Sequence, residues 1–232
     1  MKKSFLCIVS VLFLFGSAFA QKDKIEYKPN MDKKKIHYGY YLGLNKKGFK
    51  IKYNLQNSFV DVEETYGFNI GLVLGYNISD NLNLRFEPGL SSNTKTLTFT
   101  NTTIPNTDKD KIRKVPATYF RMPLLLQFRT NRLDNMRAFV IGGVSYDYNF
   151  SSNQNNSDDN TEGQFRMKTS NFMYEIGLGV DLYLPHFKLS PSIRGVFAIN
   201  NEMVPDDISS SPWTSPIDYL GTRGVFFNLT FE

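Results

Sequence analysis

The sequence predicts an all-β fold, an eight-stranded antiparallel barrel that crosses a membrane with its strands. Three observations predict it. Eight segments alternate apolar and polar side chains with period two, the connections between them are alternately short and long, and the chain opens with a leader peptide. Short turns at one end and long loops at the other are typical of bacterial outer-membrane barrels, whose turns lie in the periplasm and whose loops are extracellular.

Residues 1–20 have the features of a signal peptide. Two lysines precede an apolar run from Phe5 to Phe15, and residues 18–20 (Ala-Phe-Ala) give the small-x-small pattern of a cleavage site. The apolar run is too short to span a bilayer well. We therefore expect cleavage between Ala20 and Gln21, followed by a periplasmic arm over residues 21–35 and a barrel over residues 36–232.

The composition of the mature chain excludes several classes of protein. The lone cysteine, Cys7, leaves with the leader, so no disulfide or thiolate metal site is expected. Without Lys2 and Lys3, 25 of the 27 basic residues remain against 22 acidic ones, an excess too mild to indicate a nucleic-acid partner. No later stretch approaches the roughly 18 to 20 apolar residues of a membrane helix.

The first four segments each place large apolar side chains on one face. HYGYYLGLN (37–45) alternates Tyr and Leu mostly with Gly, and YGFNIGLVLGYN (66–77) sets Phe, Ile and Leu mainly against Gly and Asn. NLNLRFEPGL (81–90) and YFRMPLLLQFR (119–129) set Leu, Phe and Met mainly against polar or charged residues. This alternation predicts strands with one apolar and one polar face.

The last four segments repeat the pattern with one irregularity. In MRAFVIGGVSYDYNF (136–150) apolar residues share a face with a serine and Asp147, whereas YEIGLGVDLYL (174–184) is the most regular of all. FKLSPSIRGVFAIN (187–200) and TRGVFFNLTFE (222–232) complete the set. The number of strands is even, so the first strand starts and the last strand ends on the same side of the membrane. This agrees with the barrel prediction.

Two orientations of these faces are possible. A soluble lipocalin-like barrel would turn the apolar faces inward, whereas a membrane barrel turns them outward, and the lengths of the segments suit the 9 to 11 residues of a membrane strand. We favour the membrane barrel, whose narrow interior is filled by its own side chains and is too narrow for a diffusion porin. The charges expected to pair inside it are Arg85, Glu87, Arg121, Glu175, Asp181 and Arg194.

The final segment carries a possible insertion signal. Such barrels carry a polar-x-Gly-x-x-apolar-x-apolar order in the last strand, which Thr222, Gly224, Phe227 and Leu229 match, with Phe231 continuing the apolar face. An alternating strand of any kind would show much of the same pattern. We expect this segment to pair with the first strand, because closure removes both unpaired edges.

Several stretches resemble the PorT family of Bacteroidota. The opening KPNMDKKKIHYGYYLGLNKKGFKIKY (28–53) has its Pro-Asn-x-Asp-Lys approach and aromatic-Gly-aromatic strand, and the element EIGLGVDLYLPHFKLSP (175–191) is similar to that family as well. The resemblance implies an outer-membrane component of type IX secretion, which exports proteins with C-terminal signals and in many relatives supports gliding motility. It implies a role in export through other secretion components, without the barrel being the conduit.

Two alternatives of different classes stay open, a lipid-modifying enzyme and a general envelope-stability barrel. An enzyme would need a histidine beside a nucleophile near the outer leaflet, but both histidines, His37 and His186, map to the periplasmic end. Glu87, Glu175 and Asp181 could form an acid–base set, although arginine-paired lumen residues are the simpler interpretation. No metal or cofactor motif is present, so we expect no enzyme and no cofactor.

Contacts with partners are expected from the arm or from the loops, because loops carry function more often than a barrel wall. Outer-membrane lipid and other secretion proteins are the expected partners, and the oligomeric state is left open. The loops predicted to face outside are 101–114, 153–164 and 203–221. Trp213 and Tyr219 in the last of these are candidate contact residues.

Overall fold

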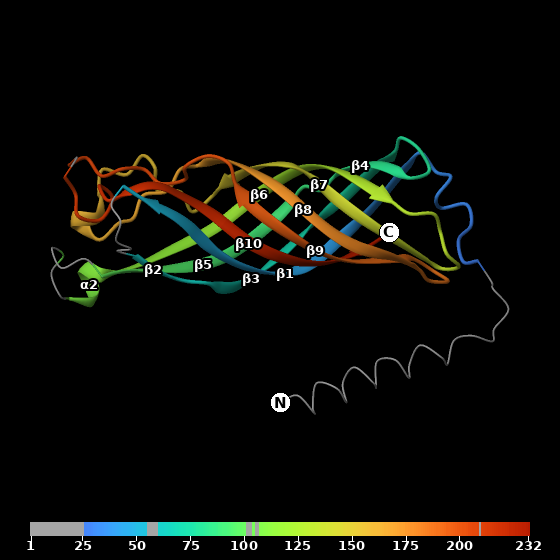
Figure 1. Ribbon diagram of the computed structural model, residues 1–232, viewed down its shortest axis with the longest axis horizontal. Helices are drawn as coiled ribbons and strands as arrows, with labels where there is room; N and C mark the ends of the chain where they lie inside the picture. The colour runs from blue at the N-terminus through green and yellow to red at the C-terminus, as the bar shows by residue number, and fades with distance from the viewer. Residues whose placement is uncertain (1–25, 55–59, 101–103, 105–106, 209) are drawn as a thin grey trace, which may run out of the picture.

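A computed structural model describes residues 26–54, 60–100, 104, 107–208 and 210–232 (Figure 1). The predicted leader and its cleavage point lie outside the described residues. Within the described ranges the chain forms ten strands: β1 (Ile36–Tyr53), β2 (Val60–Glu63), β3 (Thr65–Asn77), β4 (Leu82–Phe86), β5 (Gly89–Phe99), β6 (Ile112–Arg129), β7 (Met136–Asn149), β8 (Ser170–Tyr183), β9 (Lys188–Ala198) and β10 (Ile217–Phe231).

The strands form one antiparallel sheet that closes on itself. From β6 to β10 each strand pairs with the next, and β10 pairs with β1 over the range from Tyr40↔Phe231 to Tyr53↔Ile217. On its other side β1 pairs with β3, which continues the ring through β4 and β5 to β6. Closure gives the first and last strands partners on both sides, so neither is an exposed edge.

The ten strands occupy eight positions around this ring. β4 and β5 are separated only by Glu87 and Pro88, and both keep one register against β3 and against β6. Pro88 has no N–H to donate, but its carbonyl accepts from Leu72 N (2.9 Å), while Glu87 N donates to Pro123 O (3.1 Å). β2 and β3 are separated by Glu64 alone and follow one another along β5.

The two ends of the barrel differ as the sequence predicts. The connections 78–81, 130–135 and 184–187 are short and lie at the end where the N-terminal arm enters, which we call the arm end (Figure 1). The longer connections lie at the opposite end, the loop end. These are the segment before β6 with the short helix α2 (Asp108–Lys111), residues 150–169 with the 3-10 turn η1 (Asn160–Glu162), and residues 199–216.

Several strands run further toward the loop end than predicted. Residues 112–114 belong to β6 and residues 217–221 to β10, so the predicted loop limits 101–114 and 203–221 were wrong at these positions. The error has a physical cause. Beyond the apolar region the outward positions carry charged and polar residues such as Lys50 and Lys114, so the alternation that reveals a strand is lost while the ladder continues.

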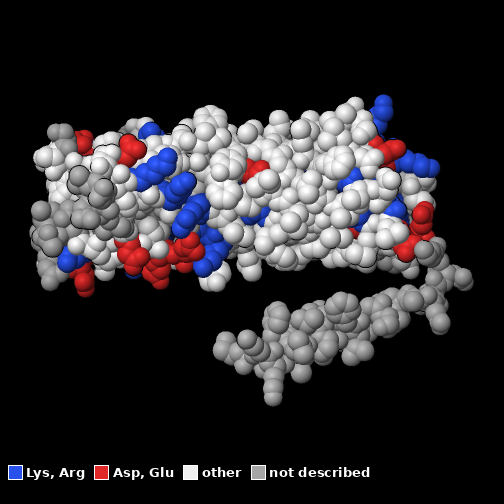
Figure 2. All heavy atoms as spheres, viewed as in Figure 1, with Lys and Arg blue, Asp and Glu red and all other residues white. Residues whose placement is uncertain are grey.

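The apolar faces point outward, as predicted for the membrane barrel. Leu44, Ile176 and Leu178 are 60 to 65% exposed, and Figure 2 shows a broad, almost uncharged band between two ends that carry charges. Glycine, polar and charged side chains occupy most of the inward positions between them. No helix in the described part of the chain is both long and apolar enough to cross a membrane.

The largest group of buried apolar side chains among the described residues lies at the loop end. A cluster of buried residues from the strand ends and the loops packs there and closes the barrel with a small hydrophobic core. Its members are Phe49, Val60, Leu97, Phe99, Ile104, Val115, Phe165, Met167, Met203, Trp213, Ile217 and Leu220. Two smaller clusters, Leu125 with Phe139 and Ile141 and Met173 with Val196 and Phe226, lie elsewhere in the interior.

Candidate functional site

The middle of the lumen holds a chain of ion pairs between residues of five strands and Glu87, which lies between β4 and β5. Arg85 Nε donates to Glu87 Oε1 (2.7 Å), and Arg194 donates to both oxygens of Glu87 (2.5 and 3.2 Å). Arg121 bonds Glu175 and also donates to Asp147 Oδ2 (2.9 Å). All these side chains are at most 5% exposed, so each charge depends on its partner to offset the cost of desolvation.

Five of the six predicted lumen charges fall in this chain, and the sixth is nearby but bonded differently. Asp181 is fully buried and accepts a hydrogen bond from Ser190 Oγ (2.6 Å) rather than forming an ion pair with a described cation. Asp147 was missed as a member. It lies in the least regular segment, where apolar neighbours on the same face hide a charged inward position.

Two further cations lie between this chain and the loop-end core. Lys47 Nζ donates to Ser91 Oγ (2.7 Å), and Lys95 Nζ donates to Thr222 Oγ1 (2.8 Å) while lying 3.8 Å from the centroid of the Phe49 ring. Hydroxyl groups and aromatic faces therefore hold both ammonium groups. Neither lysine was predicted as a lumen residue, because both lie beyond the segments in which the alternation is apparent in the sequence.

At the arm end a second buried cluster surrounds Glu232. Its carboxylate bonds His37 Nδ1 and lies 2.9 Å from Lys188 Nζ and 3.4 Å from Arg85 Nη1. The backbones of Glu232 and Lys188 exchange hydrogen bonds of 3.0 and 2.7 Å. Glu232 thus connects β1, β4 and β9 at the mouth of the barrel.

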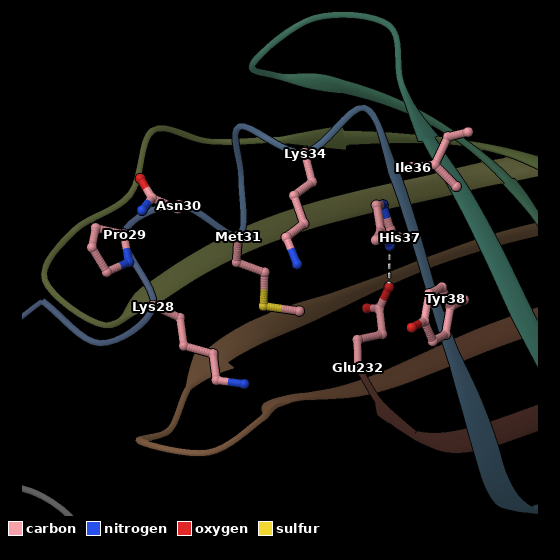
Figure 3. Close-up of a pocket in the computed structure, with 9 residues that line it drawn as sticks. All are labelled: Lys28, Pro29, Asn30, Met31, Lys34, Ile36, His37, Tyr38 and Glu232. Atoms are coloured by element: carbon pink, nitrogen blue, oxygen red, sulfur yellow. Dashed lines mark hydrogen bonds and ion pairs between the residues drawn. The ribbon is translucent and has the colours of Figure 1, made fainter.

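A pocket of about 410 Å³ opens beside this cluster (Figure 3). The arm supplies one wall with residues 28–31 and Lys34, while the start of β1 and Glu232 supply the other. The side chains of Lys28 and Lys34 extend toward the space between the walls, and Lys28 Nζ also bonds the carbonyl of His186. The pocket therefore combines two ammonium groups with apolar lining.

The arm is held across the mouth of the barrel by Asp32. Its carboxylate lies 3.2 Å from Arg137, 3.8 Å from Arg132 and 3.9 Å from Arg129, and it accepts from Tyr183 Oη (2.6 Å). Asp32 belongs to the Pro-Asn-x-Asp-Lys stretch noted in the sequence. The resemblance drew attention to this stretch, but only the structure shows that its aspartate joins the arm to three arginines.

Of the residues considered for acid–base chemistry, Glu87 and Glu175 share Arg194 as a neighbour (2.5 and 4.0 Å), whereas the histidines lie elsewhere. His37 and His186 both lie at the arm end, His37 buried and His186 in the exposed turn 184–187. The oxygens of Glu87 and Glu175 are bound by arginines, and Asp181 is bound by a serine. The described residues contain no group of three or more His, Cys, Asp or Glu that could hold a metal ion.

A family model, the outer membrane protein beta-barrel domain, matches residues 19–204. The chain belongs to this family. The location of this barrel is therefore the outer membrane, and its outward apolar band faces lipid. No curated protein matches the chain significantly.

Solved outer-membrane barrels are similar to this one at low identity. Neisserial surface protein A is 11% identical, with 82% of this chain and 95% of that chain covered and a TM-score of 0.44. OprG from Pseudomonas aeruginosa is 14% identical over 84% and 91% of the chains, with a TM-score of 0.45. The outer membrane protease OmpT from Escherichia coli is 10% identical over 89% and 97%, with a TM-score of 0.45.

The structure shows where the two predicted contact residues of this outer-membrane barrel lie. Trp213 is only 8% exposed, its Nε1 donates to Asp110 O (3.0 Å), and the Arg113 guanidinium lies 5.7 Å from its ring. The indole is thus part of the loop-end core and offers little surface to a partner. Tyr219 lies in strand β10 and not in a loop, and its hydroxyl donates to Ala198 O (2.8 Å).

The residues of the predicted insertion signal divide between the two faces of β10. Thr222 and Gly224 point into the lumen, and Phe227 and Leu229 point toward lipid. Phe231 stacks on Tyr40 of β1 with ring centroids 5.1 Å apart. Recognition of this strand by an insertion machine stays a prediction.

Proposed function

We propose that this barrel is a non-enzymatic component of the type IX secretion system. In this role it supports export of proteins with C-terminal sorting signals, and through them gliding motility, by binding other protein components of the system. The PorT-like opening of the sequence motivates the proposal. The arm end faces the periplasm on this assignment, because short turns of such barrels lie there.

The observation that carries the proposal is the filled interior. Ion pairs occupy the middle of the lumen, buried lysines and an apolar core occupy the loop end, and the docked arm with Glu232 covers the arm end. A barrel filled in this way does not pass a folded cargo. It acts through its surfaces, and the pocketed arm surface is built by the stretch that resembles PorT proteins.

A charge reversal at the pocket tests the proposal in cells. In a deletion strain complemented with Lys28→Glu/Lys34→Glu, we expect surface cargo to fall at least fivefold, measured by protease accessibility on intact cells. The matched control is Lys109→Glu/Lys111→Glu in α2 at the loop end, which changes the same charge and should leave export unchanged. Heat-modifiable migration of the barrel in both strains shows that it is folded and inserted.

Normal surface delivery of cargo in the complete deletion strain would reject the secretion role. Lipid A mass spectra and detergent sensitivity of the same strain separate the alternatives. A changed lipid A structure with normal export would favour the lipid-modifying enzyme. Detergent sensitivity with normal export and unchanged lipid would favour the envelope-stability barrel.

A further inference from the structure

A row of basic side chains lies on the outer wall of the barrel, away from the arm-end pocket. Lys46, Lys50 and Lys52 are exposed at outward positions on β1, with Gly48 at the position between Lys46 and Lys50, and Arg223 on β10 is 54% exposed. In the β1–β10 register Arg223 pairs with Gly48, which places it between Lys46 and Lys50. Figure 2 shows basic side chains gathered in such a diagonal row.

The row begins where the apolar band ends. The preceding outward residue on β1 is Leu44, and the next outward residue on β10 after Arg223 is Val225, both exposed and apolar. Acyl chains therefore meet the wall up to Leu44 and Val225. The basic row rises from that line toward the loop end, at the depth of the headgroups of that leaflet.

Only one end of the row is neutralised by a neighbouring carboxylate. Glu64 lies 3.2 Å from Lys46 and 3.8 Å from Arg223, with its side chain over Gly48. Among the described residues no carboxylate lies within ion-pair distance of Lys50 or Lys52, and the Lys52 ammonium lies 5.6 Å from the centroid of the Tyr219 ring. Two exposed cations thus remain available to an anion.

We propose that this row binds the phosphate of a lipid headgroup in the leaflet at the loop end. A ligand bound by this row must lie beside the barrel wall with its apolar part against the apolar band. A membrane lipid has this arrangement, and a soluble protein does not. Anionic headgroups are attracted to basic side chains held at the membrane surface. Lys50 and Lys52, at neighbouring outward positions, offer a phosphate more than one depth of binding.

The test measures lipid retained by the purified full-length mature barrel. The protein is refolded in a phosphate-free detergent, mixed with phosphorylated lipid A in the presence of EDTA, and analysed by native mass spectrometry. We expect one or more lipid A molecules to be retained, and Lys50→Gln/Lys52→Gln to reduce retention about tenfold. Neither lysine is ion-paired to a described residue, so the variant should fold. Lys33→Gln/Lys35→Gln at the arm end is the charge-matched control.

Three further arms test the role of the phosphate and its source. Dephosphorylated lipid A should be retained about as weakly as by the variant, and raised salt should reduce retention by the unsubstituted protein, because the attraction is electrostatic. Inorganic phosphate at millimolar concentration should not displace the lipid. Equal retention by the Lys50/Lys52 variant, equal retention of dephosphorylated lipid, or displacement by inorganic phosphate would each overturn the proposal.

Discussion

At the scale of single residues, some lumen carboxylates each bind more than one cation. Glu87 is the clearest case, because both Arg85 and Arg194 donate to it and all three side chains are at most 4% exposed. The sequence could place these charges on one face of their strands, since the alternation fixes the direction of each side chain. It could not show which charges pair, because the partners come from β4 and β9.

Replacing Glu87 with glutamine should destabilise the barrel strongly. The substitution leaves Arg85 and Arg194 buried with one acidic partner fewer, and breaking a buried pair in this way costs about 3 to 5 kcal/mol. Reversible urea unfolding in lipid vesicles, followed by tryptophan fluorescence, measures the change. Glu63→Gln, at an exposed position of β2, is the control and should stay within about 0.5 kcal/mol. Equal stabilities of the two variants would contradict the role of Glu87.

Asp159, in the loop before η1, gives a prediction for pH. Its carboxylate accepts from Thr161 Oγ1 (2.6 Å) and Thr161 N (2.8 Å), and these hydrogen bonds lower its pKa. A lowered folded-state pKa means that the bonds contribute stability above the ordinary aspartate pKa, and that this contribution is lost as the pH falls through the lowered value. The Thr161 amide resonance should therefore titrate with a midpoint below the ordinary aspartate value.

Asp159→Asn is the control for this titration. Asparagine can still cap the turn, but it has no proton to gain, so the Thr161 resonance should no longer move in this range. A midpoint at or above the ordinary aspartate pKa in the unsubstituted protein would contradict the assignment.

At the scale of elements, the strands were predictable to the extent that they face lipid. β8 and β10 were found with the correct faces because leucine, isoleucine and phenylalanine alternate with small and polar residues. The division at Glu87–Pro88 was not predicted, because the chain remains in register across it. The arm was predicted as a periplasmic segment that could contact partners. Its contact with the barrel depends on arginines at the ends of β6 and β7 and in the turn between them, far along the chain, which the sequence does not connect to it.

Removing the carboxylate of Asp32 should release the arm from the mouth of the barrel. Asp32 is 22% exposed, whereas the arginine side chains that face it are 1 to 12% exposed. Because solvent still reaches the carboxylate, Asp32→Ala should weaken docking by about 1 kcal/mol. We expect amides of residues 27–34 to exchange hydrogen about fivefold faster, with exchange in β8 unchanged. The exposed neighbour Lys33→Ala should have no effect. Unchanged protection of the arm in Asp32→Ala would show that other contacts hold it.

At the scale of the whole molecule, the orientation of the two faces decides both the location and the filled lumen. The same alternation could have built a soluble barrel with an apolar interior. The structure instead exposes the large side chains and buries arginine, lysine and glutamate, and the family to which the chain belongs is one of outer-membrane barrels. The sequence predicted this orientation from strand length and face chemistry. The loop-end core was not predicted, because it is assembled from residues of several loops and strand ends.

This orientation predicts a dependence on depth for charges placed on the outer face. Leu178 lies in the middle of β8 and is 60% exposed, so Leu178→Arg should destabilise the barrel by about 2 to 4 kcal/mol in lipid vesicles. Met136 also faces outward but lies at the arm end of β7, where the same substitution should cost about 0 to 1 kcal/mol because the side chain reaches water. Unfolding in guanidinium chloride from vesicles of one composition measures both. Similar costs at the two positions would mean that Leu178 does not face the hydrocarbon. The expected difference would place Leu178 of β8 nearer the middle of the membrane than Met136 of β7.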